Sequence, residues 1–203
     1  MSRQRFPLLG ECVALELVNT LVGGELELLC TAADTHRWLQ AHSDQLPEGA
    51  LLNPPQPRAL RALRTAIGEL VSAAVEGRSP DRAALRAVNR ASAGAPSAPM
   101  LIWGEHGPAL AEAQGGSRGD AATLASVARS AIALLGGPDR DRLRTCAAPG
   151  CSMRFVATNP RRHWCSPETC GNRVRVARHY ARQRKADGGM QAASDEVTPS
   201  RSE

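Results

Sequence analysis

Four cysteines in the last third of the chain have the spacing of a metal site. Cys146 and Cys151 form one C-x4-C pair, and Cys165 and Cys170 form a second. A tetrahedral zinc ion takes four thiolates, and each close pair can supply the two ligands of one edge while the span between the pairs folds back. Four sulfur ligands leave no coordination position for water or substrate. The spacing therefore predicts one structural Zn²⁺ and no catalytic residue, so we do not expect an enzyme.

The cysteines lie in the most basic stretch of the chain. Residues 140–185 contain twelve Lys or Arg and two acidic residues, a net charge of +10, whereas the rest of the chain carries −5. Four thiolates and one zinc ion add about −2, which leaves the metal-loaded stretch strongly positive. Such a surface attracts a phosphate backbone and releases its counterions. We therefore expect a polyanionic partner.

The composition is typical of a helix-rich protein with an aliphatic core. Of the 203 residues, 42% are hydrophobic but only 3% are aromatic, so Leu, Val, Ile and Ala must fill the core. No apolar run is long enough to cross a membrane, and the N-terminal stretch does not resemble a signal peptide. These features predict a cytoplasmic protein without membrane contacts. In a reducing cytosol paired cysteines favour metal binding, and disulfide pairing stays open as the alternative.

Periodic apolar residues predict helices along the first two thirds of the chain. The expected helices are residues 12–22, residues 31–42 behind a Thr31–Asp34 capping pair, a long helix ending at Gly77, a helix capped by Ser79 and starting at Pro80, and residues 120–135. Between the last two, residues 99–114 are expected to form a β-hairpin, although the alanine-rich second arm also suits a helix.

Turn and strand patterns around the cysteines predict a treble-clef-like zinc finger. A Pro-Gly turn lets the first cysteine pair fold back on itself as a zinc knuckle. Residues 153–157 alternate in polarity and are expected to pair with residues 161–164 in a short hairpin. Ser166 and Pro167 then start a helix with Cys170 in its first turn. The expected fold is mainly α with a small β component (α+β): a helical N-terminal domain followed by this finger.

The last helix of the finger is expected to have a packing face and a free face. Val174, Ala177 and Ala181 recur at helical spacing and are expected to pack, while arginines line another face. Guanidinium groups bind phosphates bidentately and contact guanine edges in the major groove. The candidate nucleic-acid contacts are Arg161, Arg162, Arg173, Arg175, Arg178 and Arg182. Arg173 could instead bond within the finger.

Three side chains have competing explanations. His163 could replace one cysteine as a zinc ligand, but the complete cysteine quartet favours four sulfurs. Trp164 is expected to cover the metal site rather than stack on a base, because small modules have few large apolar groups. Asn19, within an apolar helix, is expected to satisfy a buried backbone group rather than line a pocket.

Two motifs resemble known families. Cys170-Gly171-Asn172-Arg173 is the motif of the CGNR zinc finger, and the sequence around it resembles that module from end to end. ALELVNTL, near the N-terminus, resembles the LALDLVNT opening of the ABATE domain. This domain precedes CGNR fingers in bacterial proteins described as stress-induced transcription regulators. The resemblance implies an ABATE-like domain over residues 1–139 and a CGNR finger over residues 140–186, whose four cysteines bind zinc.

The boundaries carry two further expectations. The ABATE-like domain is expected to keep its own aliphatic core, so that loss of zinc would unfold the finger and spare the domain. The polar residues 187–203 have almost no large apolar side chain and are expected to form a disordered tail.

Two functions from different classes fit these features. In the first, the protein is a DNA-binding transcription regulator involved in a stress response, with an N-terminal domain that senses a signal or forms a homodimer. In the alternative, the finger binds RNA or serves as an adaptor for an acidic protein. The arginines favour nucleic acid over protein, and we favour DNA over RNA. A lone finger buries little surface, which favours doubling by a second copy. No motif defines the target sequence or a ligand.

Overall fold

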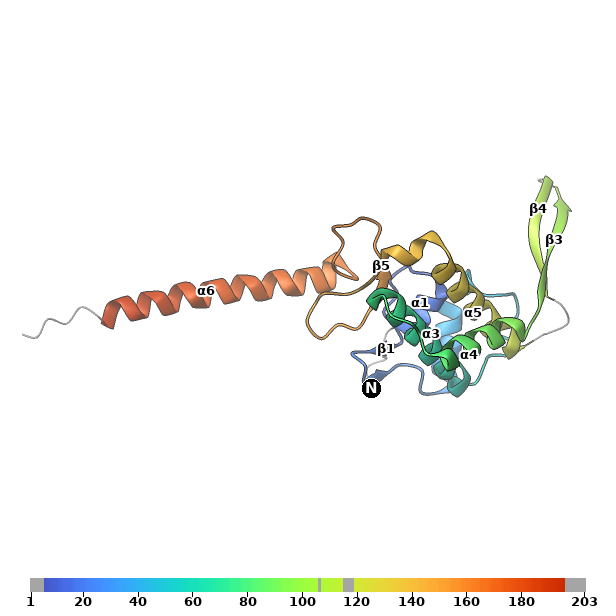
Figure 1. The fold of residues 1–203 in the computed structure, drawn as a ribbon, viewed down its shortest axis with the longest axis horizontal. Coiled ribbons are helices and arrows are strands. Elements are labelled where there is room, and N and C mark those ends of the chain that lie inside the picture. Colours follow the sequence, from blue (N-terminus) through green and yellow to red (C-terminus); the bar gives the residue numbers. More distant parts are fainter. Residues whose placement is uncertain (1–5, 106, 115–118, 196–203) are drawn as a thin grey trace, which may run out of the picture.

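The chain folds into a helical body from which a hairpin and a long helix extend at opposite ends (Figure 1). This computed structural model describes residues 6–105, 107–114 and 119–195. Its α-helices are α1 (Val13–Val18), α2 (Ala32–Ala41), α3 (Pro57–Glu76), α4 (Arg82–Ala93), α5 (Asp120–Gly136) and α6 (Asn172–Asp195). A 3₁₀ helix spans Pro138–Arg142, and a π-helical turn at Pro167–Gly171 leads into α6. Its antiparallel strand pairs are β1 (Leu21–Val22) with β2 (Leu26–Glu27), β3 (Ser97–Gly104) with β4 (Gly107–Gln114), and β5 (Leu143–Thr145) with β6 (Arg154–Val156). The predicted α+β class is confirmed.

Local signals set the start of α2 and the end of α3 as predicted. Thr31 Oγ1 accepts a 3.2 Å hydrogen bond from the backbone N–H of Asp34, and the Asp34 carboxylate accepts from Thr31 N at 2.8 Å. Pro57 starts α3, where its missing N–H costs nothing. Gly77 ends the same helix with φ +66°, a conformation that favours glycine.

The end of α1 and the start of α4 differ from the prediction. α1 ends at Val18, because the chain turns there into the small β1–β2 hairpin and Leu28 N donates to Thr20 O. α4 begins after Asp81 instead of Ser79, and the Asp81 carboxylate accepts from Ala83 N at 2.8 Å. Asp caps a helix as well as Ser does, so residue type alone did not choose between the two positions.

The core of the body joins α1, α3 and α5. Leu15, Leu60 and Val127 are fully buried in it, and the indole of Trp38 from α2 fills one side. Leu143 of β5 belongs to the same core and is 2% exposed. The core therefore crosses the expected boundary between residues 139 and 140, so the first strand of the finger is packed as part of the body.

The finger hairpin is formed by different strands from those predicted. β6 pairs with β5, with Leu143 opposite Val156, and residues 161–164 form no strand. The zinc knuckle is thus the loop of this hairpin, because it connects the two paired strands. The predicted partner was wrong because the alternation in residues 153–157 shows that a strand exists and does not identify the strand beside it.

Helix α6 leaves the body after its first turn (Figure 1). Val174 is half-buried, but Ala177 and Ala181 are exposed, so the predicted packing face is wrong beyond one turn. The finger has a small core, and among the described side chains of the helix Val174 packs against it. The helix continues to Asp195, into residues 187–203 that were expected to be disordered; residues 196–203 lie outside the described residues.

Candidate metal centre

Four sulfur atoms converge at the base of α6. The Sγ atom of Cys165 lies 3.9 Å from that of Cys151 and 3.6 Å from that of Cys170, and Cys151 and Cys170 are 3.7 Å apart. All four sulfurs, that of Cys146 included, lie within 4.8 Å of one another. Ligands about 2.3 Å from a tetrahedral zinc ion are separated by about 3.8 Å. The cluster fits one zinc ion, and His163 is not part of it.

Backbone hydrogen bonds hold the ligands in place. Cys146 follows β5 directly, and its N–H donates to Met153 O at 2.9 Å, which closes the knuckle. Gly150 has φ +71° in this turn, so Cys151 can face back toward Cys146. The N–H of Cys165 donates to the Cys146 sulfur at 3.3 Å and links the two cysteine pairs. Such N–H groups stabilise thiolate charge around a metal.

Burial of the four cysteines favours a bound cation beside them. Burial raises the pKa of the Cys151 thiol to about 11, and burial also raises the pKa of Cys165. Burial acts to raise the pKa of Cys146 as well, but backbone hydrogen bonds from Cys165 and Ala148 bring it below its ordinary value. Four thiolates are therefore not stable side by side without a positive ion, and zinc supplies that charge while protons are released. The site is one structural zinc site.

The CGNR motif has a physical explanation at two further positions. A Cβ on Gly171 would lie 2.9 Å from Cδ1 of Trp164, so the indole requires a glycine there. Trp164 packs against the cysteine cluster, as predicted for a cover of the metal site. The guanidinium of Arg173 donates to Pro149 O at 3.2 Å and lies 3.7 Å from the Cys170 sulfur. Arg173 thus connects α6 to the knuckle, which was the alternative to nucleic-acid contact.

Arg162, a candidate nucleic-acid contact, is half-buried and bonds within the finger. Its guanidinium donates to Val156 O at 3.1 Å and to Cys165 O at 2.8 Å. It also lies 4.5 Å above the ring of Phe155 and 3.6 Å from the carboxylate of Glu11. The carbonyls that accept these hydrogen bonds are not paired within a strand or helix. They therefore hold this cation more favourably than solvent does. Arg162 therefore positions the finger on the body.

A buried polar junction joins the finger to the body. Asn19 is 1% exposed, donates to Arg154 O at 2.9 Å and accepts from Arg154 N at 2.8 Å, which confirms its predicted structural role. The Arg154 guanidinium donates to Ser72 Oγ of α3 at 3.1 Å, and the Glu11 carboxylate accepts from Val156 N at 3.1 Å. The roles of Glu11 and Arg154 were not predicted from the sequence, because each residue lies more than eighty positions from its partner, Val156 or Ser72, in the chain.

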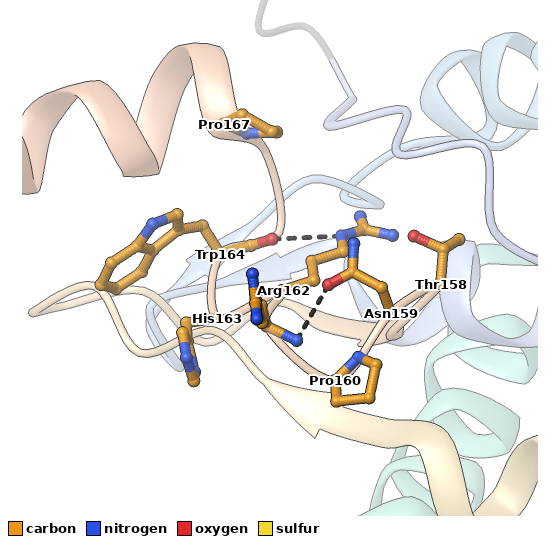
Figure 2. Close-up of a pocket in the computed structure, with 8 residues that line it drawn as sticks. Thr158, Asn159, Pro160, Arg162, His163, Trp164 and Pro167 are labelled. Carbon is orange, nitrogen blue, oxygen red and sulfur yellow. Dashed lines mark hydrogen bonds between the residues drawn. The ribbon is translucent and has the colours of Figure 1, made fainter.

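The four remaining candidate arginines, like Arg173, are exposed on the surface. Arg161 lines a hollow of about 800 Å³ beside the start of α6. Figure 2 labels Asn159, Arg162, His163 and Trp164 around the same hollow. Arg175, Arg178 and Arg182 are exposed along α6, where they line a shallow groove of about 430 Å³ with Val176 and His179. Arg175 also makes a long 3.5 Å contact to Pro167 O at the helix start. The free guanidinium groups therefore gather at the base and along one face of α6.

Comparison with protein-family models identifies both parts of the chain. Residues 11–138 match the ABATE model, described as "Putative stress-induced transcription regulator", and residues 142–183 match the CGNR zinc finger. A comparison with curated proteins finds no match. The ABATE match covers more than half of the chain, and the finger match covers the cysteine cluster described above. The chain belongs to the ABATE family and carries a CGNR zinc finger after its ABATE domain.

Proposed function

We propose that the protein is a cytoplasmic, DNA-binding transcription regulator in which zinc fixes the base of α6 and the arginines of α6 contact DNA. The observation that carries the proposal is the charge and exposure of α6. From Asn172 to Arg184 it has five arginines and no acidic residue, and all five arginines are exposed. The family description as a stress-induced regulator agrees with this role.

The geometry of α6 suits the major groove of DNA. Arg175, Arg178 and Arg182 lie within about 60° of one another around the helix axis, at a spacing of 100° per residue. The thirteen residues from Asn172 to Arg184 span about 20 Å, and the major groove is about 12 Å wide. A single exposed helix can therefore enter the groove without rearrangement of the body. Arg161, exposed at the base of the helix, would contact a flanking phosphate.

The zinc site supports this role without reacting itself. Four sulfur ligands leave zinc no position for a substrate, so the proposal includes that the protein is not an enzyme. The described residues contain no helix long and apolar enough to span a membrane. The ABATE domain is left as the part that senses a signal or pairs with another copy, and the buried junction at Asn19 and Arg154 is its link to the finger.

A genomic binding profile of the full chain tests the proposal. The variant for comparison replaces Arg175, Arg178 and Arg182 with alanine and keeps the four cysteines. We expect sharp peaks that share a sequence for the native chain and none for the variant. Cross-linking to RNA without enrichment on DNA would support the RNA-binding alternative, and enrichment on neither would support the protein adaptor.

A further inference from the structure

The β3–β4 hairpin exposes large apolar side chains on both of its faces. Met100, Leu101, Ile102 and Trp103 are 46%, 69%, 46% and 77% exposed. Successive residues of a strand point to opposite faces, so Leu101 and Trp103 share one face and Met100 and Ile102 share the other. The hairpin extends away from the body, on the side opposite to α6 (Figure 1). A contiguous apolar patch of this kind marks a contact surface.

An isolated two-stranded hairpin is marginally stable in water, so this one requires a cover. Each of its strands contains a proline, Pro99 opposite Glu112 in β4 and Pro108 opposite Trp103 in β3. Proline has no N–H and occurs in strands where its nitrogen faces away from the paired neighbour. Both outer edges of the hairpin are therefore poor templates for another strand. Contact through a face is favoured over addition of a strand at an edge.

The charge of the hairpin excludes two classes of partner. Residues 97–114 contain no Lys or Arg and two glutamates, Glu105 and Glu112. A phosphate backbone or an anionic lipid surface would be repelled by this segment, in contrast to the basic finger. The surface fits an apolar protein surface of low charge.

We propose that this surface is filled by the hairpin of a second copy of the chain, with the Leu101–Trp103 face of each copy packed against the other. The same face on both copies forms a self-complementary two-fold contact. Each eight-residue strand is about 27 Å long, and burial of one face in two copies removes on the order of 1,000 Å² of surface, near the lower limit for a specific interface. The contact is therefore reversible and depends on concentration.

This inference goes beyond the proposed function, because it does not require DNA. The hairpin and α6 leave the body at opposite ends, so the contact would leave both α6 helices free (Figure 1). A dimer of this kind carries two fingers, each at an outer end. Self-association and DNA binding can then be measured separately, and the failure of one leaves the other intact.

Sedimentation of the zinc-loaded full chain over a range of concentrations tests the proposal. We expect a concentration-dependent mass that approaches twice the 21.5 kDa of one chain. The variant carrying Leu101→Ser and Trp103→Ser should dissociate at least about 100-fold more readily, because two anchors are lost. Both side chains are exposed, so the fold and the zinc content should not change. The matched control, Met100→Ser with Ile102→Ser, alters the other face and should keep the dimer.

Fluorescence gives a second readout. In the native chain the emission of Trp103 should shift to shorter wavelength as concentration rises, because its exposed indole leaves water, and this shift should be absent from a Trp103→Phe variant. Native protein with the mass of one chain at every concentration would overturn the proposal, as would a dimer that survives the Leu101 and Trp103 substitutions. Capture of an unrelated protein by a monomeric native chain would identify a different occupant and also overturn it.

Discussion

The two halves of the zinc finger differ in how much protein surrounds them. The β5–β6 half is built into the body, with Leu143 in the core of α1, α3 and α5 and Val156 packed against that core. The α6 half contacts the finger through its first turn, and its residues 175–184 are exposed. One half therefore serves as an anchor and the other as a free surface.

Zinc is the connection between these halves. Cys146 and Cys151 lie on the anchored side, and Cys170 lies where α6 begins. Few apolar contacts hold α6 to the rest of the finger, so its direction depends on the metal, on the Trp164–Gly171 contact and on Arg173. A helix held in this way keeps Arg175, Arg178 and Arg182 exposed while its base stays fixed.

The largest expected effect comes from removal of one zinc ligand. Cys151→Ser should abolish zinc binding, which contributes about 10 to 16 kcal/mol in zinc-finger peptides. Because Leu143 shares the core of the body, we expect faster amide hydrogen exchange in α1 and α3 as well as in the finger. The sequence alone had predicted that the body would be spared. Cys30→Ser, an exposed cysteine outside the cluster, is the control. Unchanged exchange in α1 and α3 would show that the body is independent.

A smaller effect is expected at the junction. Asn19→Ala leaves the N–H and C=O of Arg154 without their partner, so the free energy of unfolding should fall by about 3 kcal/mol in urea titrations. The control is Asn89→Ala on the exposed face of α4, which should change stability by less than about 0.5 kcal/mol. Equal effects of the two substitutions would mean that the junction does not anchor the finger.

The contact at the start of α6 is expected to contribute less. Gly171→Ala places a methyl group 2.9 Å from the Trp164 ring, which should cost about 1 to 2 kcal/mol and change the fluorescence of Trp164. Gly136→Ala is the matched control, because a methyl group there meets no atom within 4 Å. If both variants have the stability and emission of the native chain, the indole does not constrain the motif.

The smallest effect is a pH dependence at the junction. Burial raises the pKa of Glu11 above its ordinary 4.5, although the Val156 N–H and Arg162 act to lower it. A carboxyl whose pKa is higher in the folded state takes up a proton on folding, so its contribution to stability increases as pH falls from neutrality toward about 4.5. Glu11→Gln cannot titrate. The stability of the native chain relative to this variant should therefore increase between about pH 7 and pH 5, measured with saturating zinc. A decrease over that range would contradict the assignment.

Features set by neighbouring residues were predictable from the sequence. The Thr31–Asp34 capping box, the end of α3 at Gly77 and the cysteine cluster each depend on residue types a few positions apart or on known ligand chemistry. The helical class followed from periodic aliphatic residues.

Features set by distant partners were not predictable. The pairing of β6 with β5, the inward orientation of Arg162 and the role of Glu11 depend on residues brought together by the fold. Arg162 and Arg175 have the same side chain, and only the structure shows that Arg162 is half-buried among carbonyls of the finger while Arg175 is exposed on α6. The exposure of Ala177 and Ala181 was missed for a related reason, since periodicity does not show where a small core ends.

The salt dependence of DNA affinity tests most directly whether α6 is the binding surface. On duplex DNA the logarithm of affinity should fall linearly with the logarithm of salt concentration, with a slope of about −0.9 per phosphate contact. Replacing Arg175, Arg178 and Arg182 together with alanine should flatten this slope by about two to three units and leave the zinc content unchanged. The matched control replaces Arg82, Arg86 and Arg90, three exposed arginines on α4, and should keep the native slope. If the α6 variant keeps a folded finger and shows the affinity and slope of the native chain, α6 is not the DNA-binding surface.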